Sequence, residues 1–242
     1  MSDSEHKLPI SIDPCPIKAT SIEVRFDPAP PPEAVFGIIY QGLKEYVSAV
    51  EQLPAASLPF EMLQQDPTWS VQPQYKLIGK ELLILVGPHT VTLVSEAPYP
   101  GWHKLALMAR DIFAAVDKTG AIKTPTRFGL RYVTYFDGDV LDRLTLDISI
   151  ATESAIGKQT YLKTVLGGPD CPSLLQIMNN TQLMTDSTRS GTVIDIDTFT
   201  ERQPLDTAHD LNQFLEHAHV AEKELFFKLL KPDFLTSLNP KY

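Results

Sequence analysis

Three strand-like segments lie so close together in this chain that only one kind of sheet can contain them. They are QYKLIG, ELLILVG and TVTLVSE, at positions 74–79, 81–87 and 90–96. The breaks between them, at Gly79-Lys80 and Gly87-Pro88, have the composition of tight turns. Turns this short join antiparallel neighbours, because a parallel pair needs a crossover of about a dozen residues or more. The spacing predicts an antiparallel meander in which the apolar run 82–86 is a central strand covered on both faces.

Other segments with a clear hydrophobic period surround this meander. Alternating residues predict further strands at 21–26, 126–136, 144–151, 161–167, 173–186 and 192–199. Helical spacing of apolar residues occurs in 33–47, in 105–116, and from a start near Asp206 or Thr207 to Pro232. Strands in hairpin order with helices between them indicate an α+β fold, in which helices pack on one face of a largely antiparallel sheet.

The order of these segments divides the chain into an arm and two lobes. We predict an extended N-terminal arm at 1–18, a first α+β lobe at 19–138, and a second α+β lobe at 139–242 that ends in the long helix. The first lobe resembles an elaborated split β-α-β unit. No convincing linker separates the lobes, so we expect them to be fused into one body.

Charge and cysteine content narrow the choice of partner and compartment. Acidic residues outnumber basic ones by 30 to 21, which gives a formal net charge of −9 and disfavours non-specific binding of nucleic acid. No apolar run is long enough to span a bilayer, and the N-terminus lacks the apolar core of a signal peptide. Cys15 and Cys171 do not form a disulfide framework. We therefore expect a cytoplasmic protein without a membrane segment.

The sequence lacks the common signatures of catalysis and metal binding. It contains no nucleophile elbow, zinc-protease helix, phosphate-binding loop or dinucleotide fingerprint. Asp195 and Asp197 share a strand face, but without a third acidic ligand we interpret them as the solvent face of an antiparallel strand. His217 and His219 point about 200° apart on a helix, and no histidine is placed beside Cys171. We predict no catalytic residue, no metal site and no cofactor.

The predicted strand 126–136 carries two arginines on one face. Strand alternation puts Arg127 and Arg131 on the same side, and it puts Glu23 and Arg25 together on the first predicted strand. One interpretation is a partly buried ion-pair ladder in which Glu23 pairs with an arginine across the sheet. The other is an anion pocket that a ligand enters beside a glycine between the arginines. Both remain open; the candidate ligand-binding residues are Arg131, Arg127, Arg25 and Glu23, and Arg131 is the favoured ligand contact.

Several short motifs resemble a known family. The matching pieces are Pro16-Ile17 followed by IEVRF, PYPGW at 98–102, RFGLRY at 127–132, and a long C-terminal helix with a histidine. Together they resemble a sporadically distributed, biochemically uncharacterised family of bacterial and archaeal proteins. The chain departs from that family at His103-Lys104, where an acidic residue is usual, and at Thr134, where an asparagine is usual. A site built on that asparagine would be altered here. In the PYPGW motif we expect Trp102 to anchor the packing of the helix that follows.

The resemblance implies no reaction, substrate or cofactor, and patchy distribution is typical of mobile or defence-linked genes. Combined with the missing motifs, it leads us to expect a non-catalytic binding protein whose partner is another protein. The alternative is an enzyme or sensor that binds a phosphorylated or nucleotide ligand through Arg127 and Arg131. The sequence indicates no particular oligomeric state.

Overall fold

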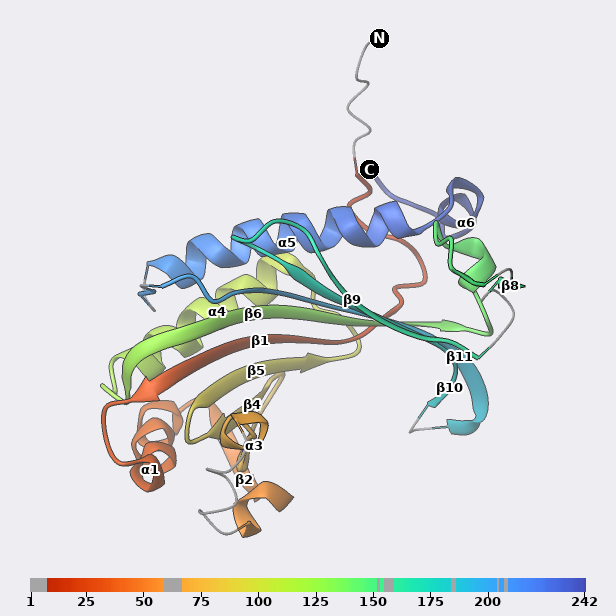
Figure 1. The fold of residues 1–242 in the computed structure, drawn as a ribbon. Helices are drawn as coiled ribbons and strands as arrows, with labels where there is room; N and C mark the ends of the chain where they lie inside the picture. The colour runs from red at the N-terminus through yellow and green to blue at the C-terminus, as the bar shows by residue number, and fades with distance from the viewer. Residues whose placement is uncertain are drawn as a thin grey trace. The chain divides into compact units, whose positions relative to one another are not determined.

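The computed structural model describes residues 8–58, 67–151, 153–154, 159–183, 186–203, 205–206 and 209–242. It shows a mixed α+β protein with a large antiparallel sheet, as the sequence predicts. Within the described residues, nine strands form one sheet in the order β2-β3-β4-β5-β1-β6-β11-β10-β9 (Figure 1). The strands are β1 (Ile17–Pro28), β2 (Val47–Gln52), β3 (Tyr75–Gly79), β4 (Leu83–Gly87), β5 (Thr90–Glu96), β6 (Ile122–Asp137), β9 (Tyr161–Leu166), β10 (Ser173–Leu183) and β11 (Asp186–Thr200).

Helices and short elements complete the chain. The helices are α1 (Pro32–Leu43), α3 (Pro67–Ser70), α4 (Trp102–Asp117), α5 (Asp210–Leu229) and α6 (Pro232–Ser237), with 3-10 turns η1 (Pro54–Ser57) and η2 (Leu141–Arg143). β7 (Ser149–Ile150) and β8 (Glu153–Ser154) form a separate small hairpin.

Contacts group the chain into two compact units that are discontinuous in sequence. The first unit contains Met1–Lys18, Tyr132–Thr198 and Ala218–Tyr242, and the second contains Ala19–Arg131 and Phe199–His217. Each unit is therefore built from stretches that are far apart in the sequence. Several elements, among them β6, β11 and α5, begin in one unit and end in the other.

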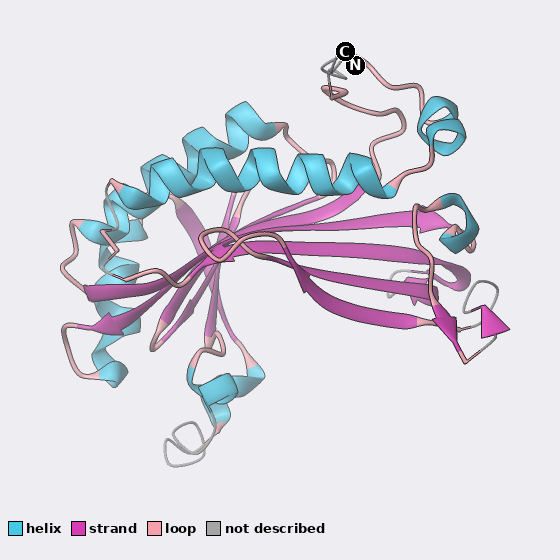
Figure 2. Ribbon diagram, turned by 45° about the horizontal axis from the view of Figure 1, so that its top comes forward, coloured by secondary structure: helices cyan, strands magenta, loops and turns pink. Residues whose placement is uncertain are grey.

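The second unit contains the predicted meander. β3, β4 and β5 pair antiparallel in succession, and β5 then pairs with β1. α4 packs against this sheet, as the ribbon in Figure 2 shows for the helices and strands. Its apolar stripe, which includes Leu105, Ile112 and Phe113, is buried. The predicted double coverage of β4 is wrong: Ile84 and Val86 are buried, but Leu83 and Leu85 on the other face are only partly buried. Its apolar density reflects residues that suit a pleated surface on both faces.

The first predicted helix is shorter than its apolar spacing suggests. α1 ends at Leu43, and Val47 begins β2, which pairs with β3. Pairing with β3 therefore overrides the helical period beyond Leu43. Gly42 lies close to the C-terminal end of α4, because an added Cβ would lie 3.3 Å from Ala115 O and still closer to the side chain of Thr119, just after the helix. Gly37, on the same helix, has open space where its Cβ would be.

The first unit has its core between one face of β10 and β11 and the helices that end the chain. Phe136 of β6 stacks on Phe226 of α5 and contacts Phe234 of α6. The buried cluster around them contains Ile12, Val140, Leu141, Leu144, Leu175, Ile177, Ile194, Ile196, Leu229 and Leu230. The strands predicted at 161–167, 173–186 and 192–199 are therefore confirmed in type, with their ends shifted.

The strand predicted at 144–151 is largely wrong. Only Ser149–Ile150 is a strand, and the preceding residues follow η2. Thr145 donates its backbone N–H to Leu229 O and its hydroxyl to Lys228 O, both over 2.7 Å. These bonds satisfy carbonyls at the end of α5, so the segment serves the helix terminus instead of a sheet.

The start of the long helix differs from the prediction by a few residues. α5 begins at Asp210, and Asp206 lies one turn before it, where its carboxylate accepts a hydrogen bond from the His209 N–H over 2.9 Å. Asp206 thus satisfies a free amide near the helix start, as a capping residue does. The alternative start at Thr207 lies outside the described residues.

Candidate functional site

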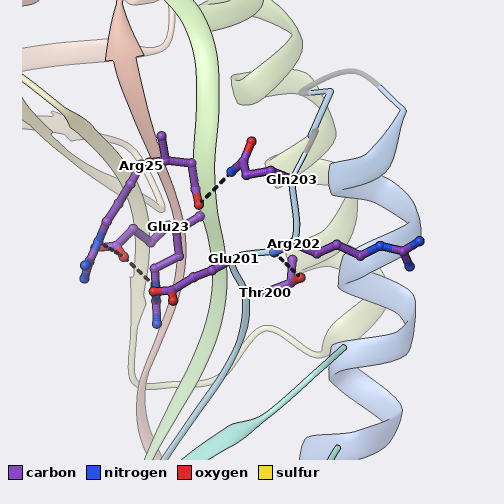
Figure 3. A network of polar contacts seen from close by, with 8 residues as sticks. Glu23, Arg25, Thr200, Glu201, Arg202 and Gln203 are labelled. Atoms are coloured by element: carbon purple, nitrogen blue, oxygen red, sulfur yellow. Dashed lines mark hydrogen bonds and ion pairs between the residues drawn. The ribbon is translucent and has the colours of Figure 1, made fainter. Parts of the chain in front are cut away.

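Three of the four predicted site residues meet in the second unit. Glu23 lies between two arginines: Arg127 Nη1 donates to Glu23 Oε1 over 2.6 Å, and Arg25 Nε donates to the same oxygen over 2.7 Å. The strands β1 and β6 that carry them are neighbours in the sheet. Figure 3 shows the side chains of Glu23, Arg25 and Glu201 converging, while Arg202 points away. The predicted cross-strand ion pair of Glu23 with an arginine is present.

Arg127 is held on more than one side. Its side chain is 8% exposed, its guanidinium lies 4.7 Å from the ring centroid of Phe199, and its Nε lies 3.9 Å from Glu201 Oε1. The cluster therefore contains two cations, Arg25 and Arg127, and two carboxylates, Glu23 and Glu201. This balance satisfies the buried guanidinium within the protein, as a structural ion pair requires. The geometry favours the ladder interpretation for Arg127.

The fourth predicted residue, Arg131, differs from the other three in its exposure to solvent. Arg131 is exposed, whereas Gly129, two residues before it on β6, is buried. An exposed arginine stays in contact with water and is accessible to a ligand in solution. Of the four predicted residues, Arg131 is thus the one whose environment suits a ligand contact.

A second candidate surface, which the sequence interpretation did not single out, lies on β9 and β10 in the first unit. Registers of β9, β10 and β11 place three rows of side chains on the face opposite the apolar core. Each row runs from β9 through β10 to β11. The middle row is polar, and each outer row has apolar or aromatic side chains on β9 and β10; the rows are Tyr161–Met178–Val193, Lys163–Gln176–Asp195 and Val165–Leu174–Asp197. We call Tyr161, Lys163 and Val165, with Leu174, Gln176 and Met178 behind them, the β9 surface.

The aromatic residue of the β9 surface is both exposed and fixed. Tyr161 is 60% exposed, yet its hydroxyl donates to Gln176 Oε1 over 2.7 Å. Gln176 in turn donates its amide to Asp195 Oδ2 over 3.3 Å. Asp195 is 3% exposed, so its interpretation as part of a solvent face is wrong. The chain of hydrogen bonds orients the Tyr161 ring across the strands.

The alternation in YLKTVL was the only sequence signal for this surface. It puts Tyr161, Lys163 and Val165 on one side of the strand, but it does not reveal which side faces a core. Val165 is 57% exposed, so the apolar members of this alternating set face outward.

The other polar groups considered in the sequence have structural surroundings. His219 is partly buried and its Nδ1 lies 3.2 Å from the hydroxyl of Tyr132. Burial, with a further contribution from Asp170, raises the pKa of the Cys171 thiol, which lowers its fraction of nucleophilic thiolate. Among the described residues, no group of three or more His, Cys, Asp or Glu side chains is placed to hold a metal ion. No helix of the described chain is long and apolar enough to cross a membrane.

Among the described residues, two of the hollows in the surface lie in the second unit. One, of about 420 Å³, lies beside Lys80, Glu81 and the segment Ala97–Pro100, where Lys104 pairs with Glu81 over 2.8 Å. The other, of about 710 Å³, lies between α1 and α4 beside Gly37. Each hollow is lined by charged side chains of both signs, and neither is lined by the arginines of β1 and β6.

Comparison with known proteins gives no further assignment. No protein-family model matches the chain, and no curated protein matches its sequence.

Proposed function

We propose that this protein is a non-catalytic binding protein that holds another protein at the β9 surface. The observation that carries the proposal is Tyr161, which is 60% exposed while its hydroxyl is bound to Gln176. An exposed apolar residue on the same face of the strand, Val165 at 57%, extends the contact area. A tyrosine that is already immobilised loses little entropy on binding, and tyrosines are enriched among residues that dominate interface energies.

The partner in this proposal belongs to the same cellular system as the protein. The family that the sequence resembles has the patchy distribution typical of mobile or defence-linked genes, and this analogy supports a partner encoded close to the protein. The alternative, an enzyme or sensor for a phosphorylated or nucleotide ligand, receives less support. Arg127 and Arg25 share Glu23 as a partner, and an anion would have to compete with that carboxylate.

A capture experiment with matched variants tests the proposal. The full chain is used to retain proteins from the native host, and the retained proteins are quantified by mass spectrometry. Replacing Tyr161 and Val165 with serine should reduce retention of the true partner at least about tenfold, as expected when hot-spot residues are lost.

The chain offers a closely matched control. Tyr46 and Val50 have the same residue types and spacing, and each is 42% exposed. Replacing these two with serine should leave retention unchanged. A partner that survives the change at Tyr161 and Val165, or that is lost equally with both pairs, contradicts the proposal.

A further inference from the structure

Within the described part of the chain, the backbone groups of β9 that point away from β10 belong to the same residues that expose their side chains. The N–H of Asn179 donates to Thr160 O over 3.3 Å, which identifies 160 and 179 as a bonded pair in the β9–β10 register. In an antiparallel ladder, bonded and non-bonded pairs alternate. The backbone groups of Tyr161, Lys163 and Val165 therefore point away from β10, toward the edge of the sheet.

The pairing of the strand at this edge is regular. β9 pairs with β10 over six consecutive residues, from Tyr161 to Leu166, without a register shift. The strand at the other end of the sheet, β2, has a register shift between Val47 and Ala49. Irregularities of that kind discourage a further strand from pairing. In the described part of the chain, β9 is the terminal strand and its edge has no such irregularity.

We infer that β9 binds an extended segment of another protein by strand addition, and that this segment places an acidic residue opposite Lys163 between two apolar residues. The inference rests on the proposed function and specifies how the partner is held. Main-chain hydrogen bonds to Tyr161, Lys163 and Val165 provide the general attraction. The apolar residues of the segment meet Tyr161 and Val165, and the acidic residue pairs with Lys163.

Lys163 decides between possible occupants. It is exposed, and it makes no ion pair with any described residue. If β9 of a second copy paired antiparallel with this β9 around the strand centre, Lys163 would face its own equivalent, and like charges directly opposite each other destabilise a strand pair. A strand from a different protein that places a carboxylate opposite Lys163 avoids this repulsion between like charges and replaces it with an attraction.

Three capped nine-residue peptides test this inference. The first peptide has Val at positions 3 and 7, Glu at position 5 and Thr at all other positions. The second peptide has Lys in place of Glu. The third peptide has the sequence of the first, with N-methyl groups on the backbone nitrogens of both Val residues and of Glu. The readout is amide hydrogen exchange of the full chain by NMR. The first peptide should slow exchange at Tyr161, Lys163 and Val165, and it should bind at least about threefold more tightly than the second. The N-methylated peptide should give no such protection, because its donors toward β9 are removed.

Charge reversal provides the matched variant. Lys163→Glu should invert the preference, so that the peptide with Lys binds more tightly, while Lys44→Glu on the exposed end of α1 should leave the preference unchanged. Absence of protection by the first peptide at concentrations up to about 1 mM overturns the inference. Equal binding of the N-methylated peptide also overturns it. Concentration-dependent protection of the same amides without peptide overturns it in favour of a second copy.

The two proposals fail separately. If partner capture depends on Tyr161 and Val165 but the complex leaves the amides of Tyr161, Lys163 and Val165 unprotected, strand addition is wrong and the proposed function stands. If capture does not depend on Tyr161 and Val165, the proposed function is wrong.

Discussion

Arg127 and Glu23 are 104 residues apart in the chain, yet Arg127 Nη1 lies 2.6 Å from Glu23 Oε1. The arginine is nearly buried and the carboxylate is 21% exposed. The neighbouring strands β1 and β6 are thus joined by a hydrogen bond between two charged groups, one nearly buried and one partly exposed to solvent. Such a bond fixes which residues face each other across the strands, because a slip of one strand by one residue would turn its side chain to the opposite face of the sheet from its partner.

Replacing each arginine with methionine should separate the roles of Arg127, Arg25 and Arg131. Arg127→Met leaves Glu23 with Arg25 alone, so we expect a loss of about 2–3 kcal/mol, below the roughly 3–5 kcal/mol for breaking a fully buried pair. Arg25→Met should lower the free energy of unfolding by less than about 1 kcal/mol, because the Arg25 side chain is 34% exposed. Arg131 is exposed and should change stability by no more than about 0.5 kcal/mol. Chemical denaturation measures all three, and near-zero losses at every position would refute the ladder.

Glu222 should make the protein less stable as pH rises. Burial raises the pKa of its carboxyl to about 8, with an opposing contribution from Lys223. The folded state then holds a proton that the unfolded chain releases near its ordinary pKa of about 4.5. The contribution of Glu222 to stability is therefore full below about pH 4.5 and is lost progressively up to about pH 8.

A neutral substitution tests this pH dependence. Glu222→Gln should match the original protein near pH 4.5 and exceed it in stability at pH 8, by on the order of a few kcal/mol. The exposed Glu45→Gln serves as the control and should leave the slope unchanged. Unfolding free energies measured at several pH values decide the matter, and parallel curves for Glu222→Gln and the original chain would contradict the expectation.

Two glycine substitutions should change stability in opposite directions. A Cβ at Gly191 would lie 2.2 Å from Phe136 O and 2.4 Å from Tyr135 Cζ. Gly191→Ala must therefore displace backbone, at a cost of about 1–3 kcal/mol. Gly37→Ala meets open space inside α1 and should stabilise by about 0.5–1 kcal/mol through helix propensity. Thermal unfolding of the two variants provides the measurement; a gain at Gly191 or a loss at Gly37 would show that the surroundings differ from those described.

Trp102→Ala should cost less than the removal of a fully buried tryptophan. The side chain is only partly buried, and its indole N–H donates to Glu216 Oε2 over 3.4 Å. Arg110 donates to the other oxygen of Glu216 over 3.1 Å and remains in the variant. We expect a loss of about 1–2 kcal/mol, against roughly 3–5 kcal/mol for a buried aromatic residue. A denaturation midpoint that reports the larger loss would restore the predicted role of Trp102 as a packing anchor.

The sequence predicted the features that depend on local pattern. The stripe in α4 and the meander from β3 to β5 follow from residue period and turn spacing. Alternation also put Glu23 and Arg127 on polar strand faces, but their pairing was only one of two interpretations, and it depended on β1 and β6 being neighbours. The sequence did not predict features decided by tertiary contacts. Residues 144–151 alternate like a strand, but Thr145 bonds to the end of α5 instead. Asp195 has the sequence environment of a solvent-facing residue, but it is 3% exposed, and its carboxylate accepts a hydrogen bond from the cross-strand residue Gln176. Alternation defines two faces of a strand without saying what covers either of them.

The discontinuous second unit has a consequence for synthesis on the ribosome. Its residues 19–131 emerge first, but the remaining part, 199–217, follows only after 132–198 has been made. Glu216, the partner of Trp102, is added 114 residues later, and Phe214, which contacts Phe128, arrives with it. The growing chain must therefore keep an incomplete apolar surface in solution until most of the protein has been translated. Nascent chains in that state are the ones on which chaperones act.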